Sequence, residues 1–508
     1  MSGPLLLGID EGTTAVKAAL FDTRLRKVAQ ARRAVAVEHP RPGWVEQDPE
    51  EILAAVVAAV AEVLEHTPRR EVIAAGLDHQ GESVLAWERG SARALTPVVV
   101  WQDKRQLDML ANVDQSVARL SGMPIDPYFS AGKIAWLLAH DDAVARGREE
   151  RTLRVGTVDA FLCERLGGRF ATDLSTASRT QLLALGGVDW DERLLDAFGV
   201  QRSLLPRIGP SFGELGELRH ERWRQPLPLR AQLVDQQAAL AGSGAVRPGA
   251  VKATYGTGVF VLARTPSPAA EPGGLLPTVA WGAPPNAALP STARERASRE
   301  EGAIGEVAHA LDGGVFSAGS LLDWLAGGLG LAASAAELAA RAAEVSDSAG
   351  VELLPALDGV GAPWWLADAR GVIAGLHAGV RPAHIARAAL EGIAARVADV
   401  VEAVADTVPV ERVLVDGGLT NDPTLLQIQA DMLGLALSVG DADCTVLGAA
   451  MLAGVGAGIY ESVEQAAELL PERRVVQPQA SAAARERKRA RWRAFVRDAA
   501  RLSGASAV

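Results

Sequence analysis

A short unit made of a strand, a turn rich in glycine and threonine, and a second strand constrains the fold most, because it occurs once in each half of the chain. The first unit runs from Leu5 to Phe21 and turns at Asp10–Thr14. The second runs from Val251 to Ala263 and turns at Gly256–Gly258. Short apolar runs bounded by such turns are typical of buried strands. The recurrence of the unit predicts a duplicated fold.

Strands alternate with helices along the rest of the chain, which is typical of an α/β protein with mixed sheets. A helix is predicted from Asp48 to Leu64, because Asp48 is a favoured N-cap and Pro49 occupies the first helical position. A length of 508 residues suggests two or three domains at about 150 residues each. A Gly/Pro-rich break at Gly242–Gly249 lies between a helix and a new strand. We therefore expect one domain at residues 1–247 and a second at 248–508.

Composition excludes several classes of protein. The net charge of −11 argues against a general nucleic-acid or anionic-membrane binder. The two cysteines, Cys163 and Cys444, exclude a disulfide framework and a cysteine-rich zinc site, and we expect both in the core. The first apolar run, Leu5–Ile9, has the length of a strand rather than of a signal peptide, and we expect no membrane-spanning segment. A cytoplasmic enzyme is the expectation.

The two glycine-containing turns are candidate phosphate sites. A tight turn between strands can direct successive backbone N–H groups at a phosphate, and the hydroxyls of Thr13 and Thr14 add donors to the first turn. Asp10, at the end of the first strand, is placed to hold Mg²⁺ directly or through water. Ordinary hairpin turns use the same residues, so the pair is more informative than either member. Facing each other, the two turns would hold a polyphosphate from both domains.

Two further segments lie where strands meet helices. Asp416–Asn421 follows an apolar strand and precedes a helix from about Pro423, and its glycines would let the backbone lie against a nucleotide. The spacing is not that of a dinucleotide-binding fingerprint. Asp235 ends a strand and begins a helix. It is either a helix N-cap or a general base for an alcohol, and the two interpretations are compatible.

Taken together, these segments resemble the FGGY carbohydrate kinases, and among them the glycerol kinases most. The likeness covers nearly the whole chain in order, which makes it far more specific than any single match. It rests on Gly8–Thr14, Gly43–Pro49, Val100–Arg105, Ile125–Ser130, Gly156–Asp159, Thr176–Thr180, Asp235–Leu240, Thr254–Gly258, Gly361–Trp365 and Asp416–Gly418.

The resemblance implies two duplicated actin-like, or ribonuclease H-like, α/β domains with mixed sheets and an active site in the cleft between them. It implies ATP and Mg²⁺ as cofactors, with Asp10 handling the metal. It implies that the nucleotide is bound by Thr13, Thr14, Lys17, Thr257, Gly258, Gly314, Gly418 and Asn421.

The resemblance also implies an acceptor site for a small polyol or sugar, in which Asp235 is the base that activates the acceptor hydroxyl. Carboxylates accept hydroxyl hydrogen bonds and aromatic faces cover C–H edges, so the composition of this site suits a polyol. The residues that would line it are Gly81, Glu82, Trp101, Tyr128, Asp235, Gln236 and Phe260.

One departure bears on the acceptor. Glycerol kinases carry an arginine between the residues that correspond to Gln80 and Glu82, and this chain has Gly81. Loss of a charged donor costs about 1.5–3 kcal/mol and would open space. Two interpretations follow: a longer polyol or ketose such as a tetritol, a pentitol or xylulose fills the gap, or another side chain or water replaces the arginine and glycerol remains the acceptor.

Expectations remain for two further segments, for the partners and for alternative functions. The segment Gly282–Glu301 is expected to be an exposed loop longer than is usual in the family, and a basic C-terminal helix is expected at Ala482–Arg501. No nucleic-acid or membrane partner is expected, and a homodimer and a homotetramer both stay open. The rival functions are an actin-like ATPase without a small-molecule acceptor and a catalytically silent sugar-binding regulator.

Overall fold

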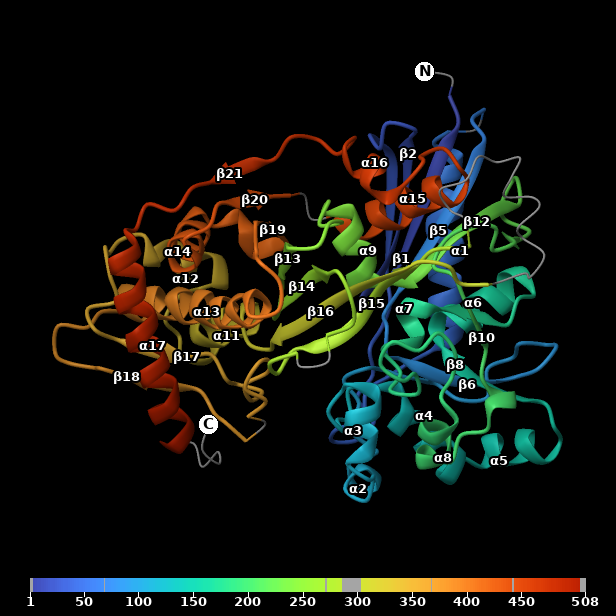
Figure 1. The fold of residues 1–508 in the computed structure, drawn as a ribbon, viewed down its shortest axis with the longest axis horizontal. Coiled ribbons are helices and arrows are strands. Elements are labelled where there is room, and N and C mark those ends of the chain that lie inside the picture. The colour runs from blue at the N-terminus through green and yellow to red at the C-terminus, as the bar shows by residue number, and fades with distance from the viewer. Residues whose placement is uncertain are drawn as a thin grey trace.

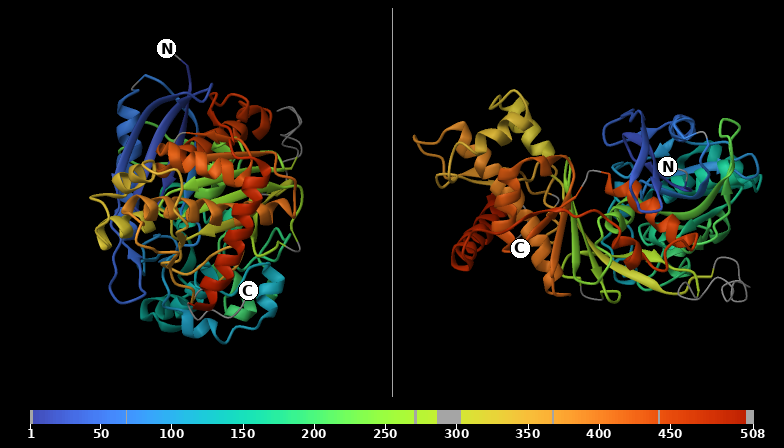
Figure 2. Two further views of the ribbon diagram at one scale, coloured as in Figure 1. Left: turned by 90° about the vertical axis from the view of Figure 1, so that its left-hand side faces the viewer. Right: turned by 90° about the horizontal axis from the view of Figure 1, so that it is seen from above.

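The computed structural model describes residues 3–67, 69–269, 272–285, 303–366, 368–440 and 443–502. The chain forms two lobes that lie side by side (Figure 1). The N-terminal half builds one lobe, and most of the C-terminal half builds the other. Seen from above, the lobes are joined through a narrower middle region (Figure 2). The loop expected at Gly282–Glu301 falls largely outside the described residues.

A six-stranded mixed sheet forms the centre of the first lobe. Strands β1 and β2 are antiparallel and joined by the first predicted turn, whereas β5 runs parallel to β1 on its other side. Strand β12 continues the parallel part next to β5. The sheet contains, in order, β11 (Glu217–Leu218), β12 (Leu227–Val234), β5 (Val72–His79), β1 (Leu5–Glu11), β2 (Ala15–Asp22) and β3 (Lys27–Ala34).

A seven-stranded sheet in the other half repeats this arrangement. Strands β13 and β14 form an antiparallel hairpin at the second predicted turn, and β19 runs parallel to β13 as β5 does to β1. The duplicated α/β fold predicted from the two hairpins is therefore confirmed. The sheet contains, in order, β15 (Leu276–Gly282), β16 (Val307–Val315), β14 (Val259–Thr265), β13 (Ala250–Tyr255), β19 (Arg412–Asp416), β20 (Leu437–Val439) and β21 (Arg474–Val476).

Three smaller sheets complete the strands. Strand β7 contains only Val98–Val99, and two residues later the Trp101 N–H donates to the Ser83 hydroxyl. The small sheets contain β4 (Glu46–Gln47), β7 (Val98–Val99), β6 (Val84–Glu88) and β8 (Leu153–Thr157); β9 (Ala171–Asp173) and β10 (Arg207–Gly209); and β17 (Glu352–Leu354) and β18 (Val372–Ala374).

Long helices cover the sheets. The predicted helix at Asp48 is α1 (Pro49–Glu65), and the Asp48 side chain caps it by accepting a hydrogen bond from the Glu50 N–H. The other helices are α2 (Leu107–Leu110), α3 (Ser116–Ser121), α4 (Ser130–His140), α5 (Asp142–Glu149), α6 (Val158–Gly167), α7 (Leu174–Ala177), α8 (Glu192–Phe198), α9 (Asp235–Gly242), α11 (Gly319–Asp323), α12 (Ala335–Ala342), α13 (Pro382–Ala405), α14 (Pro423–Leu433), α15 (Cys444–Gly456), α16 (Val463–Ala467) and α17 (Ala482–Leu502).

Helix α15 connects the two halves, because in the chain it lies between β20 and β21 of the second sheet but packs against the first sheet (Figure 1). Glycines allow this approach. A Cβ atom added at Gly8 would lie 2.0 Å from the Val446 carbonyl oxygen, and one at Gly242 would lie 2.0 Å from that of Cys444. Only glycine fits at such distances. Helix α15 therefore holds β1 and α9 in fixed relative positions, and both elements carry candidate site residues.

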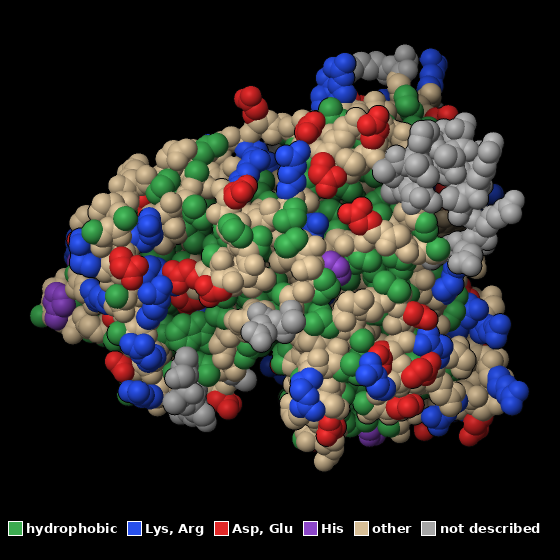
Figure 3. Space-filling view, viewed as in Figure 1, with side chains coloured by type: hydrophobic (Ala, Val, Ile, Leu, Met, Phe, Trp, Pro, Cys, Tyr) green, Lys and Arg blue, Asp and Glu red, His purple; other side chains and the backbone are tan. Residues whose placement is uncertain are grey.

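Two further expectations are borne out. Cys163 and Cys444 are both buried. The predicted C-terminal helix is present, and Trp492 and Phe495 lie on its buried face. Within the part of the chain that the structure describes, no helix has the length and apolarity that crossing a bilayer requires. On the face seen in Figure 3, acidic and basic side chains are interspersed.

Candidate active site

The end of the first hairpin carries a pair of buried carboxyl groups. Asp10 on β1 pairs in register with Asp78 on the parallel strand β5, so both side chains lie on the same face of the sheet. The ammonium group of Lys17 lies 3.4 Å from the Asp10 carboxylate. Asp10, which the resemblance assigns to the metal, therefore lies next to a second acid, Asp78, to which the sequence alone gives no role.

Carboxyl oxygens at and next to this pair are buried and lack hydrogen-bond donors. Both carboxyl oxygens of Asp78 and one of Glu11 are buried without a hydrogen-bond partner among the described residues. Burial, followed by the charge of Asp10, raises the pKa of Asp78 well above its ordinary value. Mg²⁺ prefers oxygen ligands and takes one or two carboxylates together with substrate phosphates. The donor set at Asp10 and Asp78 therefore fits Mg²⁺.

The turn of the first hairpin contacts an aromatic residue of the expected acceptor site. The indole N–H of Trp101 donates to the Thr13 hydroxyl at 3.0 Å, and that hydroxyl donates to the Gln80 side chain at 3.3 Å. The ring of Trp101 packs edge-on against Tyr128 at a centroid distance of 5.6 Å. The structure thus brings together Thr13, Trp101 and Tyr128, whereas Thr14 is exposed on the same turn.

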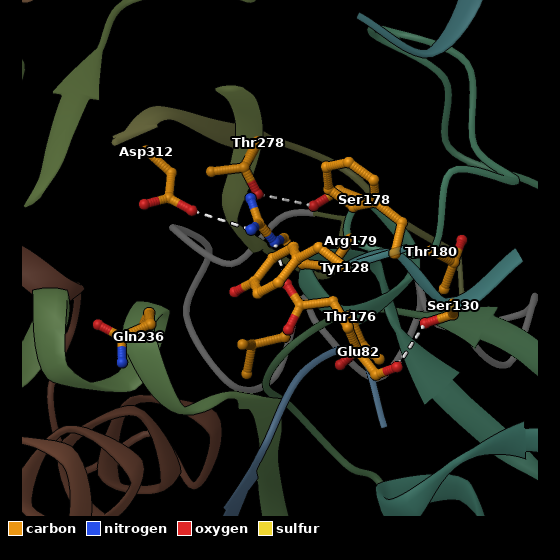
Figure 4. A network of polar contacts seen from close by, with 12 residues as sticks. Glu82, Tyr128, Ser130, Thr176, Ser178, Arg179, Thr180, Gln236, Thr278 and Asp312 are labelled. Atoms are coloured by element: carbon orange, nitrogen blue, oxygen red, sulfur yellow. Dashed lines mark hydrogen bonds and ion pairs between the residues drawn. The ribbon is translucent and has the colours of Figure 1, made fainter. Parts of the chain in front are cut away.

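Glu82 is paired with an arginine from another part of the chain. The Arg179 Nε donates to Glu82 at 2.7 Å, and an Nη of Arg179 lies 2.9 Å from Asp312 (Figure 4). The structure does not show the expected space directly next to the Gly81 Cα, because a Cβ atom there would lie 2.8 Å from Cγ1 of Val234. A guanidinium group is present beside Glu82, and it comes from residue 179 rather than residue 81.

Asp235 is the first residue of α9, and Val234 occupies the N-cap position. The N-cap interpretation of Asp235 is therefore wrong: its carboxylate instead accepts a hydrogen bond from the Gln236 N–H at 2.6 Å. The Gln236 side chain accepts from Lys252 of β13 at 3.3 Å, which joins the two halves. Burial, followed by the charges of Glu82 and Asp10, raises the pKa of Asp235 to about 7.

The second hairpin lies against backbone rather than against acids. The Thr257 carbonyl accepts hydrogen bonds from the Ala318 and Ser320 N–H groups, which fixes the turn to the start of α11. A Cβ atom at Gly258 would lie 2.6 Å from the Val315 carbonyl oxygen. Gly314 pairs in register with Phe260 on the neighbouring strand. Four expected residues, Thr257, Gly258, Gly314 and Phe260, thus gather around β14 and β16.

The Asp416–Asn421 segment lies beside the second hairpin. Gly417 has a φ of 97°, which disfavours other residues. A Cβ atom there would lie 2.4 Å from the Tyr255 carbonyl oxygen, so only glycine fits at this position. Gly418 begins a 3₁₀ turn, η3 (Gly418–Asn421), and the Asn421 side chain donates to its carbonyl at 3.1 Å. A Cβ atom at Gly418 would meet no described atom within 4 Å. One face of this turn is therefore open.

Sequence reasoning missed four residues that shape the site. Arg179 lies in a matched segment without an assigned role and Asp312 in none, and neither has a local pattern that reveals a contact with the other. The signal for Asp78 was its place at the end of a strand next to β1. Lys252 is a charged residue inside an apolar strand, which is unusual enough to indicate a buried partner.

Comparison with known proteins gives a consistent result over the whole chain. A model of the N-terminal domain of the FGGY family of carbohydrate kinases matches residues 5–242, and a model of the family's C-terminal domain matches residues 251–457. The glycerol kinase of Geobacter sp. (strain M21) is 38% identical over 504 residues, which cover 97% of this chain and 98% of the relative. That of Aromatoleum aromaticum is 39% identical over 504 residues, with the same coverage.

Solved structures agree. A Plasmodium falciparum glycerol kinase with ADP superposes with a TM-score of 0.87 at 26% identity and covers 98% of both chains. A ligand-bound xylulose kinase from Lactobacillus acidophilus has a TM-score of 0.84 at 20% identity and also covers 98% of both chains, which shows a shared fold.

Fold, site and comparisons together define the class of protein: a two-domain kinase that uses ATP to phosphorylate a small carbohydrate or polyol. More particularly, the chain belongs to the FGGY family of carbohydrate kinases.

Proposed function

We propose that the protein transfers the γ-phosphoryl group of ATP to a hydroxyl of glycerol or a similarly short, neutral polyol. The observation that carries this proposal is Asp235, a carboxyl group with a pKa of about 7 beside Glu82 and Asp10. A group with that pKa is suited to accept a hydroxyl proton near neutral pH. The relatives named as glycerol kinases support the acceptor class.

Two features favour a short acceptor over a longer sugar. Val234 closes the direction in which Gly81 would otherwise leave room. Arg179 keeps a guanidinium group 2.7 Å from Glu82 without an arginine at position 81. The interpretation in which glycerol remains the acceptor is therefore the better supported one. Glu82, Trp101 and Tyr128 would hold the polyol, and Gln236 and Phe260 would complete its site.

The two hairpins would position the nucleotide. Backbone N–H groups at Thr13, Thr14, Thr257 and Gly258 would hold the phosphates, and Lys17 would add a positive charge. The open face at Gly418, together with Gly314 and Asn421, would leave room for the nucleoside. Mg²⁺, held through Asp10, would neutralise the β- and γ-phosphates when bound. We place the reaction in the cytoplasm, because a kinase of this kind needs a supply of ATP.

The proton transfer follows from the position of Asp235. As the acceptor hydroxyl attacks the γ-phosphorus, its oxygen–hydrogen bond breaks and the proton moves to the Asp235 carboxylate. The new oxygen–phosphorus bond forms while the bond to the ADP leaving oxygen breaks. Glu82 and Arg179 would orient the acceptor but would not exchange a proton. Exclusion of water from the site would limit ATP hydrolysis.

An ADP-release assay across glycerol, tetritols, pentitols, pentuloses and hexuloses tests the proposal. Asp235→Asn should lower kcat by about 10²–10⁴-fold, since a general base contributes that much, while ATP binding is kept. The exposed Asp196→Asn variant is the matched control. Because only the ionised Asp235 can accept a proton, wild-type kcat/KM should fall about tenfold per pH unit below about 7.

Three results would contradict the proposal. Near wild-type turnover in Asp235→Asn would remove Asp235 as the base. ADP release that does not depend on any added polyol would favour an ATPase without an acceptor. A preference for hexuloses over glycerol and tetritols would contradict the short acceptor.

A further inference from the structure

Arg179 lies between two carboxylates that come from different halves of the chain. Glu82 follows β5 in the first half, and Asp312 is on β16 in the second (Figure 4). The side chains of Arg179, Glu82 and Asp312 are only 3%, 5% and 9% exposed. This buried guanidinium group therefore links an acid of the first half to an acid of the second.

Two atoms of this cluster are left without a hydrogen-bond partner among the described residues. One is Nη1 of Arg179, a donor, and the other is Oδ1 of Asp312, an acceptor. Buried polar atoms are nearly always paired, and an unpaired one next to a candidate site indicates a group that the chain itself does not supply. A hydroxyl both donates and accepts, so it complements this donor and acceptor together.

The cluster is also held rigidly. Residues next to Arg179 are joined to β15 of the second sheet: the Ser178 and Thr278 hydroxyls lie 3.0 Å apart, and the Val279 N–H donates to Ser178 at 3.1 Å. Gln237 of α9 donates to Thr278 at 3.1 Å. These contacts fix Arg179 relative to both halves and to the helix that begins at Asp235. The guanidinium group is therefore already ordered before a ligand binds, so ordering it does not reduce the binding free energy.

The position of the cluster is that of the acceptor site. The Arg179 guanidinium lies 5.6 Å from the centre of the Tyr128 ring. Burial raises the pKa of Tyr128, and the charges that act on it come from Glu82, Arg179, Asp312 and Asp235. Tyr128 is therefore surrounded by the three charged members of the cluster and by the candidate base.

We propose that Arg179 and Asp312 form a hydroxyl subsite of the acceptor site, in which Nη1 donates to a polyol hydroxyl and Oδ1 accepts from it. The proposal rests on the function proposed above. A hydroxyl on a carbon other than the one phosphorylated occupies the subsite, next to the hydroxyl held by Glu82. One guanidinium cannot neutralise both Glu82 and Asp312, so the subsite selects neutral polyols and disfavours sugar acids.

Matched acceptors that differ by one hydroxyl test the subsite. Glycerol is compared with 1,2-propanediol, and erythritol with 1,2,4-butanetriol, by kcat/KM in the ADP-release assay. The wild type should prefer the fully hydroxylated member of at least one pair by about 100-fold. Asp312→Asn keeps the volume but removes the charge, and it should reduce that preference about tenfold through the KM of the acceptor, with the KM of ATP unchanged.

A control variant outside the cluster and a second variant within it show whether the effect is specific to the subsite. Asp189→Asn removes the acid of an exposed pair with Arg202, at 2.8 Å, and should leave the preference unchanged. Arg179→Lys keeps the charge but lacks the planar fork, and it should reduce the preference as Asp312→Asn does. Thermal shifts with glycerol and 1,2-propanediol in the absence of ATP should show the same order as the kinetic ratios.

The outcomes separate the subsite from the function on which it rests. If the variants lower kcat/KM for both members of a pair equally, Arg179 and Asp312 only hold the halves together and the subsite is overturned. A wild type that phosphorylates none of the four acceptors overturns the proposed function and the subsite with it. Equal or better turnover of gluconate than of glycerol overturns the selection for neutral acceptors.

Discussion

The hairpins of the two halves occupy equivalent positions but carry different chemistry. β1 pairs with β2 on one side and with β5 on the other, and β13 pairs with β14 and β19 in the same way. In this correspondence Asp10 matches Thr254, since each is the strand residue paired with an aspartate on the parallel neighbour. Those aspartates are Asp78 and Asp416.

The difference between the halves is one of charge and packing. The first hairpin brings Asp10, Glu11 and Asp78 together, and burial raises the pKa of all three. The second hairpin has a threonine and a tyrosine at the matching positions, and its turn is fixed by backbone contacts at Gly258 and Gly417. The duplicated hairpin therefore carries a cluster of buried acids in the first half, which fits a divalent cation, and a single paired aspartate, Asp416, in the second.

The largest contrast is expected from paired substitutions at the matching positions. Asp10→Asn should weaken binding of Mn²⁺ in the presence of ADP by about 10- to 100-fold, because a carboxylate that orients or holds the metal is lost. Thr254→Val should leave Mn²⁺ binding within about twofold of wild type, since no metal ligand is removed. Electron paramagnetic resonance of free Mn²⁺ measures both. Equal effects of the two substitutions would show that the halves share the metal.

Substitution of glycines in the two turns should give a smaller contrast, and here the second hairpin should be the more sensitive one. Gly258→Ala should raise the KM of ATP about tenfold, because its Cβ would lie 2.6 Å from a backbone oxygen that cannot move aside. Gly12→Ala should raise it less than threefold, since the nearest atom to its Cβ would be 3.2 Å away. Initial rates at varied ATP give both values. A larger increase in the KM of ATP for Gly12→Ala than for Gly258→Ala would show that the first turn, rather than the second, is the more tightly packed around the nucleotide.

The sequence predicted what is local or repeated. Both hairpins, α1 and the strand before Asp416 follow from apolar runs and turn residues, and the order of matched motifs gave the family. The Arg179–Asp312 pair could not be predicted, because the two residues are far apart in the chain and meet only when both sheets have formed. The contact at Gly81 has the same origin, because the nearest atom to a Cβ there belongs to Val234 of β12, which is far away in the chain.

Restoring an arginine at position 81 tests this last point and gives the smallest expected change in specificity. Gly81→Arg should destabilise the protein by about 1–3 kcal/mol, because its Cβ would lie 2.8 Å from the stiff, branched Val234. The ratio of kcat/KM for glycerol to that for erythritol should change less than threefold, since Arg179 already supplies a guanidinium group beside Glu82. Thermal unfolding and the ADP-release assay measure the two effects, and Val234→Ala in the same chain should restore much of the stability. A large increase in this ratio would show that the acceptor site lacks a guanidinium group that an arginine at position 81 provides. It would also show that Arg179 does not take over that role.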